Sequence, residues 1–264
     1  MSAYSLNSAS KLLVFVQNNL VEKLTAQVAQ YAHARGLSIE DRSSNSMLQI
    51  DNCGIDWEQF DKVLVYGSVQ FIRACKNSTI DKHILYTESD FSISSWFNVL
   101  GNNSLNGSGS VLSLAELSLK LKDAAFHVRP EFVDKAFAGG VYTAESWQSI
   151  VNERRLSQDL SCWVSPIKPI IAEFRCWVIN YEVIEISQYR RNDKMNVIRE
   201  ESHEVLDEAR RLAAIYSPAS CYVIDIAQTE HGYKVIEFNP IHCSGWYAAN
   251  IDKILDAWVT YLSV

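Results

Sequence analysis

Short apolar runs alternate with amphipathic segments through the first third of the chain, and this pattern predicts strands separated by helices. Lys11–Gln17 reads KLLVFVQ, an apolar run of strand length. Val21–Arg35 has apolar residues at helical spacing and is followed by Gly36, a typical helix stop. The alternation indicates a small α/β unit with a largely parallel sheet. Its predicted strands are Lys11–Gln17, Leu37–Ile39, Asp61–Tyr66 and His83–Thr87, and its predicted helices are Val21–Arg35 and Val69–Cys75.

Asn98–Ser110 is rich in Gly, Asn and Ser, a composition typical of a loop or linker, and we place a domain boundary there. Amphipathic helices and short strands follow it. Arg191–Glu200 has no clear periodicity and is predicted to be a polar connection. The predicted helices of this half are Val111–Ala124, Glu145–Arg155, Glu201–Tyr216 and Ile251–Leu262, and two of its predicted strands are Phe126–Arg129 and Leu160–Val164.

Ile170–Gln188 predicts a β-hairpin with Asn180-Tyr181 as its turn. A two-residue loop would pair Ile179 with Glu182. Two arginines and a glutamate on one strand face fit a solvated ion-pair lattice, or alternatively an anion site lined by guanidinium groups. The shared face would carry Glu173, Arg175, Trp177, Ile184, Ile186, Gln188 and Arg190.

Cys221–Gly245 predicts a second hairpin, which carries acids among its hydrophobic residues. A three-residue loop ending at Gly232, in the left-handed conformation, would place Asp225 opposite Glu237. Asn239 would then share their face. Facing carboxylates destabilise a sheet by roughly 0.2–1 kcal/mol, and a divalent cation reverses that effect. A solvated hairpin face is the alternative interpretation, and a register one residue over would separate the two acids.

Composition restricts the classes of partner. The chain has 264 residues, of which 48% are hydrophobic and 21% charged, and its net charge is −7. This charge does not favour nucleic-acid binding, and no apolar run is long enough to span a bilayer. Its six cysteines include no C-x-x-C pair, so we interpret them as reduced residues of a cytoplasmic protein, with no structural zinc site. MSAYSLNSAS shows no signal-peptide pattern.

Asp134–Val141 reads DKAFAGGV, where a lysine precedes a glycine pair. Backbone N–H groups of a Gly-rich loop approach phosphate closely, although this is not the P-loop pattern. Gly67-Ser68, after a predicted strand, is a turn that could also place helix N–H groups near an anion. We interpret His127, His203 and His242 as structural or solvated residues, with substrate contact as the alternative.

The order of motifs over roughly Phe126–Tyr247 resembles that of an ATP-grasp ligase. The last three elements are similar to those of RimK-type amino-acid ligases, and the combination most resembles the ATP-grasp clade named for two arginines and a lysine, which occurs in bacteria and their phages. The elements that carry the resemblance are, in order, Arg129-Pro130, the loop with Lys135, Gly139 and Gly140, Glu173-Phe174-Arg175, Tyr189-Arg190, and the acidic hairpin with Asp225, Glu237 and Asn239.

The resemblance implies a mixed α/β and α+β fold. Residues 1–108 would form a small α/β pre-ATP-grasp domain. Residues 109–264 would form a two-lobed ATP-grasp domain with antiparallel sheets, an N-lobe of about 109–165 and a C-lobe of about 166–264. The protein would lie in the cytoplasm, that of the host if it is phage-encoded.

The resemblance also implies roles for particular residues. Asp225, Glu237 and Asn239 would hold Mg²⁺ that bridges ATP phosphates, and Arg175 and Arg190 would face the γ-phosphate and the substrate carboxylate. Arg129 stands where many ATP-grasp enzymes have lysine. The remaining residues expected to bind ATP are Lys135, Phe137, Gly139, Gly140 and Glu173, with Pro166, Ile167 and Lys168 at the hinge against adenine.

The implied reaction is ligation of a carboxylate to an amine through an acyl phosphate, with ATP and Mg²⁺ as cofactors. The partners would be ATP, a carboxylate substrate and an amine acceptor, such as an amino acid joined to a peptide, protein or small amine. The alternatives are a nucleotide-binding module without ligase activity and an interaction protein whose acids are solvated.

Overall fold

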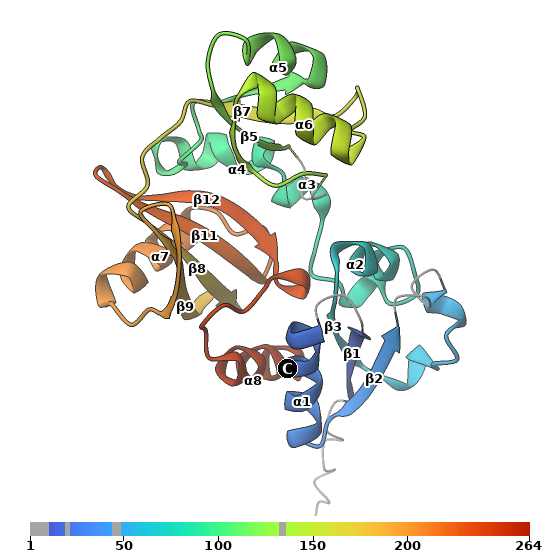
Figure 1. Ribbon diagram of the computed structural model, residues 1–264. Coiled ribbons are helices and arrows are strands. Elements are labelled where there is room, and N and C mark those ends of the chain that lie inside the picture. The colour runs from blue at the N-terminus through green and yellow to red at the C-terminus, as the bar shows by residue number, and fades with distance from the viewer. Residues whose placement is uncertain (1–10, 19–21, 44–48, 132–135) are drawn as a thin grey trace, which may run out of the picture. The chain divides into compact units, whose positions relative to one another are not determined.

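The computed structural model describes residues 11–18, 22–43, 49–131 and 136–264 (Figure 1). Its contacts divide the chain into two compact units. Unit 1 comprises Met1–Leu85 and Pro240–Val264, and unit 2 comprises Tyr86–Asn239. The predicted boundary at residue 108 concerns the division into pre-ATP-grasp and ATP-grasp domains, and it stays a prediction.

Unit 1 is built on a parallel sheet whose strand order is β2-β1-β3. Leu13, Val14 and Phe15 are at most 1% exposed, which is expected for a strand covered on both faces. α1 packs on β1 and β2, and α8, from the end of the chain, lies beside α1 and β3 (Figure 1). The elements are β1 (Leu12–Asn18), α1 (Glu22–Ala34), β2 (Ser38–Ser43), β3 (Lys62–Tyr66), α2 (Val69–Lys76) and α8 (Ile251–Leu262).

These elements confirm the strands and helices predicted for unit 1, except the strand at His83–Thr87. That segment is a 3-10 turn, Asp81–His83, followed by irregular backbone. The Leu85 N–H donates to Nε2 of His242 at 3.0 Å. In a strand, this N–H would instead donate to the main-chain carbonyl of a neighbouring strand. The prediction was wrong because Ile84 and Tyr86, although they are apolar and buried as in a strand, belong to a segment with irregular backbone.

Unit 2 contains an antiparallel sheet with the order β10-β9-β8-β11-β12. α7 packs against β9 and β11, and buries Val205, Ala209 and Leu212 (Figure 1). Its apolar stripe therefore behaves as the sequence predicted. The elements are β8 (Ala172–Ile179), β9 (Glu182–Arg191), β10 (Lys194–Arg199), α7 (His203–Ile215), β11 (Cys221–Thr229) and β12 (Gly232–Pro240).

The β8–β9 hairpin has the predicted two-residue turn, with φ of 50° at Asn180 and 66° at Tyr181, and Ile179 pairs with Glu182. Two irregularities in the ladder then shift the register within β9. The irregularity between Trp177 and Val178 places Arg175 opposite Ser187 rather than Ile186. Together with the one between Glu173 and Phe174, it places Glu173 opposite Arg190 rather than Gln188, and the two shifts correct the predicted face.

Arg191–Glu200, predicted as a polar connection, is mostly strand β10. Asn192 and Asp193 have φ of 47° and 59° and form a second tight turn, which pairs Lys194 with Arg191. The prediction failed because an exposed edge strand needs no apolar alternation, so the sequence carries little signal.

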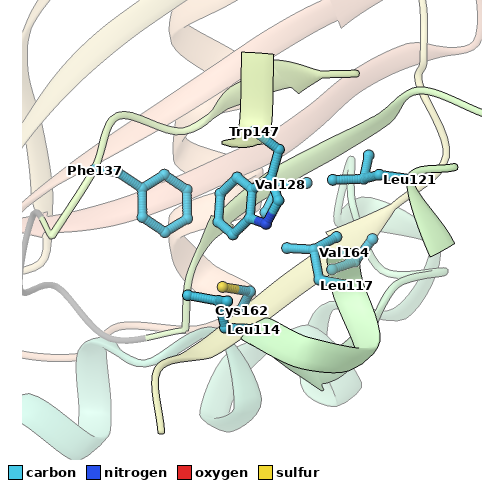
Figure 2. Packing of buried hydrophobic residues seen from close by; sticks show 8 residues of the cluster. All are labelled: Leu114, Leu117, Leu121, Val128, Phe137, Trp147, Cys162 and Val164. Atoms are coloured by element: carbon cyan, nitrogen blue, oxygen red, sulfur yellow. The ribbon is translucent and has the colours of Figure 1, made fainter. Parts of the chain in front are cut away.

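The other sheet of unit 2 has the strand order β4-β7-β5-β6 and covers a core around Trp147 (Figure 2). The predicted helix at Val111–Ala124 begins only at Leu114, because Ser113 caps it and the residues before it pair with β7. Otherwise the predicted elements are confirmed. The bounds are β4 (Ser110–Ser113), α5 (Leu114–Lys120), β5 (Phe126–Pro130), β6 (Gly140–Tyr142), α6 (Ala144–Arg154) and β7 (Ser161–Ser165).

Unit 2 begins with α3 (Glu88–Phe91) and α4 (Ile93–Leu100), neither of which the sequence analysis predicted. Leu105 and Asn106, in the Gly- and Asn-rich stretch that follows, are buried, and the Leu105 N–H donates to the Val235 carbonyl at 2.8 Å. This stretch is therefore packed against β12. The six cysteines, all within the described ranges, form no disulfide bond with one another. Within the described ranges, every helix is too short or too polar to cross a membrane.

Candidate nucleotide and metal site

The acidic hairpin brings Asp225, Glu237 and Asn239 into one cluster, as predicted. The Asn239 amide nitrogen donates to Glu237 at 2.9 Å and to Asp225, across the hairpin, at 3.4 Å. Gly232 has φ of 88°, the left-handed conformation expected at the end of the turn. The register that would separate the two acids is thereby excluded.

Arg175 holds Asp225 in a two-pronged ion pair. The two residues are directly opposite on β8 and β11, and Nε and Nη2 of Arg175 lie 2.8 and 2.7 Å from the two carboxylate oxygens. The Asp225 side chain is 2% exposed and that of Arg175 is 12% exposed. Such a buried bidentate pair fixes both side chains in orientation.

Arg129 reaches the same cluster from the other sheet. It extends from β5, donates from Nη1 to the Ile236 carbonyl at 3.1 Å and from Nη2 to Glu237 at 2.5 Å. Its Nε is buried and has no hydrogen-bond partner among the described residues. A buried donor of this kind is normally satisfied, and a bound ligand is one source of the missing acceptor.

Glu173 and Arg190 form a third pair at the outer side of the cluster. They are opposed on β8 and β9, with Nη1 of Arg190 at 3.1 Å from the Glu173 carboxylate. Glu173 is 8% exposed, whereas Arg190 is 47% exposed. The Arg190 guanidinium can therefore contact a molecule that approaches from solvent.

The two acids of the hairpin differ in proton affinity. Burial raises the pKa of Asp225, and repulsion by Glu237 adds to this effect although Arg175 opposes it. Burial acts in the same direction on Glu237, but the charge of Arg129 and the hydrogen bond from Asn239 outweigh it, so the pKa of Glu237 is lowered. Glu237 therefore stays ionised to a lower pH than Asp225 does.

On the face of the five-stranded sheet that carries the acidic cluster, two rows of opposed residues run across strands β10, β9, β8 and β11. Because opposed residues of antiparallel strands share a face, the rows define what surrounds the acids. One row joins Arg199, Ser187, Arg175 and Asp225, and the other joins Met195, Arg190, Glu173 and Ala227. Sequence reasoning missed Ser187 and Arg199, because the shifted register of β9 leaves no mark in the hydrophobic pattern.

Part of the Gly-rich loop belongs to the described residues, and Lys135 lies outside them. Phe137 is 4% exposed, and its ring packs on Trp147 with the ring centroids 5.1 Å apart, so its side chain anchors the loop in the core (Figure 2). A Cβ on Gly139 would lie 3.3 Å from the Arg129 Cβ, whereas the nearest described atom to one on Gly140 would be in the Tyr142 ring, at 3.8 Å. The backbone at residue 139 therefore runs close to Arg129.

The predicted hinge residues connect β7 to β8. Pro166 and Ile167 are exposed, and Lys168 is half-buried. Lys168 and Pro169 line a cavity of about 550 Å³, together with Phe97, Leu105 and the hairpin turn at Thr229. Burial, followed by repulsion from Lys234, lowers the pKa of Lys168. This cavity contains none of the three acids of the cluster.

The three histidines lie in different places. His242, in unit 1, is 1% exposed and hydrogen bonds to Val65 and Leu85, so it is structural. His203 is exposed at the start of α7. His127 lies near Arg129 and Glu237, where burial lowers its pKa to about 4 and the charge of Arg129 adds to this effect.

The donor set of the cluster suits Mg²⁺, which prefers carboxylate and amide oxygens and usually keeps waters and phosphate ligands. Asp225 and Glu237 supply carboxylates, and rotation of the Asn239 side chain would turn its carbonyl oxygen toward them. Among the residues that the structure describes, no group of three or more His, Cys, Asp or Glu side chains is arranged for a metal. A Mg²⁺ ion held by the two carboxylates would therefore need Asn239 and a phosphate ligand or waters to complete its coordination.

Solved structures define the class to which this fold belongs, the ATP-grasp fold. D-alanine–D-alanine ligase from Bacillus anthracis, complexed with ATP, is 15% identical with a TM-score of 0.62 over 97% of both chains. A RimK domain ATP-grasp protein from Sphaerobacter thermophilus is 12% identical with a TM-score of 0.57 over 95% of both chains. The ATP-grasp ligase PsnB, complexed with a phosphomimetic variant of a minimal precursor, Mg and ADP, is 17% identical with a TM-score of 0.57, over 98% of this chain and 100% of PsnB.

A family model matches residues 111–258, which is more than half of the chain. It describes an ATP-grasp domain, family 3 of the clade named for two arginines and a lysine. The chain belongs to this family. The predicted recognition and fold are therefore confirmed, including the antiparallel sheets. A search of curated proteins finds no match to the sequence.

Proposed function

We propose that the protein is an ATP- and Mg²⁺-dependent carboxylate–amine ligase, which joins an amino acid to a peptide, protein or small amine. Family membership supports ATP-dependent ligation in general. The observation that carries the proposal is the arrangement of Asp225, Glu237 and Asn239 beside two part-buried arginines, Arg129 and Arg175. An acidic cluster whose carboxylates are paired with guanidinium groups offers both metal ligands and phosphate-binding cations to a metal–triphosphate complex.

Asp225, Glu237 and Asn239 would hold Mg²⁺, which neutralises phosphate charge when it is bound. Arg129 and Arg175 would then be released from the carboxylates to contact phosphate oxygens, and the buried Nε of Arg129 would find an acceptor. Glu173 would bind the nucleotide, with Lys135 and the backbone of residues 137–140 over the phosphates. Pro166, Ile167 and Lys168 would contact the adenine.

Arg190 would orient the substrate carboxylate. One carboxylate oxygen attacks the γ-phosphorus, the bond to the β–γ bridging oxygen breaks, and ADP leaves. The amine then attacks the acyl carbon, inorganic phosphate leaves with the carboxylate oxygen, and the amine nitrogen loses a proton to form the amide. Positioning and charge stabilisation suffice for these steps.

The experiment is release of ADP from ATP and Mg²⁺, assayed against mixtures of amino acids and peptides. We expect turnover that depends on both an acid and an amine acceptor, and its loss in Asp225→Asn and Glu237→Gln. Glu208→Gln is a matched control, because Glu208 pairs with Arg211 at 2.8 Å on α7, away from the cluster. Equal binding of ATP with Mg²⁺ by the parent and both acid variants would refute the metal assignment.

The second candidate is an ATP-binding module without ligase activity, which the same acidic cluster would serve. It predicts binding of ATP with Mg²⁺ and thermal stabilisation by mass action, but no ADP release with any acceptor. Absence of any stabilisation by ATP with Mg²⁺ would contradict both candidates.

A further inference from the structure

Strand β10 forms one edge of the five-stranded sheet. Its inner side pairs with β9, and no other strand among the described residues pairs with its outer side. Edge strands carry main-chain donors and acceptors that can pair with another chain, and proteins usually protect them with charges, bulges or a covering element.

β10 has a charged residue at each end, Lys194 and Arg199, and an irregularity between Met195 and Ile198, yet three apolar side chains are exposed between the two charges. Met195 is 72% exposed, Val197 is 41% exposed and Ile198 is 48% exposed. Three exposed apolar residues within one short strand favour contact with an added chain rather than with water.

The register joins this edge to the candidate site. Met195 lies opposite Arg190, which lies opposite Glu173, so the three residues stand in one row on one face of the sheet. Arg190 is 47% exposed. A chain added to the outer side of β10 would thus be separated by one strand, across Met195, from the guanidinium assigned to the substrate carboxylate.

The charges near this edge favour an acidic chain. Arg191 and Lys194 flank the β9–β10 turn and are exposed, and within the described residues neither forms an ion pair. Arg191 donates instead to the side-chain oxygen of Gln188 at 3.2 Å. Asp193 in the turn is the nearest opposing charge in sequence, and Arg199 is already paired with Glu185 at 2.7 Å.

We propose that the outer edge of β10 binds an extended acidic peptide by strand addition, with one of its side-chain carboxylates directed to Arg190. Main-chain hydrogen bonds would hold the peptide, and its alternate side chains would meet Met195 and the basic groups. This inference rests on the proposed function in taking a carboxylate as the reacting group, and it names the substrate class as an extended peptide.

The test is amide hydrogen exchange of the full chain, with and without a capped peptide of alternating Val and Glu as the probe. We expect exchange in residues 194–199 to slow at least about tenfold at saturation, because main-chain groups become paired. A capped peptide of alternating Val and Lys is the matched probe. Unchanged exchange in 194–199, or equal binding of the two peptides, would overturn the proposal.

Substitutions on β10 test whether the peptide binds along this strand. Met195→Asp and Ile198→Asp should weaken binding of the Val–Glu peptide about tenfold or more, which is about 1.4 kcal/mol. Leu119→Asp is the matched control, because Leu119 is 62% exposed on α5 and makes no part of this edge. Equal weakening by Leu119→Asp would overturn the proposal.

The ligase proposal and the proposed peptide-binding edge of β10 can be refuted independently of each other. Peptide-induced protection of residues 194–199 without any ADP release would retain the binding edge and reject the ligase. ADP release with free amino acids, but without protection of residues 194–199 by the peptide, would retain the ligase and reject the binding edge.

Discussion

The guanidinium group of Arg175 contacts both carboxylate oxygens of Asp225, at 2.8 and 2.7 Å, from the directly opposed position on the next strand. The same oxygens are those that the proposed function assigns to Mg²⁺. Before the nucleotide complex binds, arginine therefore neutralises the acid. Arg129 likewise pairs with Glu237, but through a single contact from Nη2 and from the other sheet of unit 2.

Removing one member of the Asp225–Arg175 pair should destabilise the fold more than removing both. Asp225→Asn removes the bidentate ion pair of the largely buried Arg175 guanidinium, so we expect a loss of roughly 3–5 kcal/mol in the free energy of unfolding. Asp225→Asn combined with Arg175→Met should recover most of this loss. Urea denaturation measures both values, and additive losses in the double variant would contradict the coupling.

The double variant also separates stability from function. If it folds as well as the parent, any loss of ATP turnover comes from the missing site groups and not from unfolding. We expect turnover to stay at the level of the single variant. Recovery of turnover together with stability would contradict the assigned roles.

Arg129→Met should weaken ATP binding. The variant removes the group that contacts Glu237 and the buried Nε that lacks a partner among the described residues. We expect KM for ATP to rise at least about tenfold, or about 1.4 kcal/mol of binding, because a charge-assisted contact to phosphate would be lost. Arg154→Met is the control, since Arg154 is 59% exposed on α6. A similar KM in both variants would rule out a phosphate contact.

Gly139→Ala should reduce turnover more than Gly140→Ala. A Cβ at residue 139 would lie 3.3 Å from the Arg129 Cβ, a distance tighter than most such contacts, whereas the contact at residue 140 is an ordinary 3.8 Å. The added methyl at 139 should shift Arg129 or the loop. Steady-state kinetics on the two variants gives the comparison, and a larger effect at residue 140 would argue against this geometry.

Protonation of His242 should destabilise unit 1 at acid pH. Nε2 accepts from the Leu85 N–H at 3.0 Å, and Nδ1 lies 2.8 Å from the Val65 carbonyl, an arrangement that fits the neutral ring with its proton on Nδ1. Burial lowers the pKa of His242 to about 4 from its ordinary 6.5. The unfolded chain therefore binds more protons between these values.

The stabilising contribution of His242 is complete above pH 6.5 and is lost as the pH falls to about 4. Its total is on the order of 3 kcal/mol, at 1.36 kcal/mol for each pKa unit. Chemical denaturation at a series of pH values should show a smaller decline in His242→Gln than in the parent. His231→Gln is the control, because its side chain is 82% exposed. Equal slopes in the parent and His242→Gln would contradict the prediction.

Much of the fold could be predicted from local patterns. The apolar runs of β1 and β3 and the stripe of α7 are strong signals, because continuous or periodic burial restricts the residues allowed at each position. The segment at Ile84 was misread because buried residues in an irregular segment resemble a strand. β10 was missed because its exposed residues follow no periodicity.

The sequence by itself indicated the family, and the strand period of two put Glu237 and Asn239 on one face of their strand. It left two registers open for the hairpin, and the structure decided that Asp225 shares that face. Only the tertiary structure decided which cations neutralise these acids. Arg175 meets Asp225 through the pairing of β8 with β11, and Arg129 meets Glu237 from another sheet. Contacts between residues distant in sequence depend on how the sheets pack, and no local spacing encodes that arrangement.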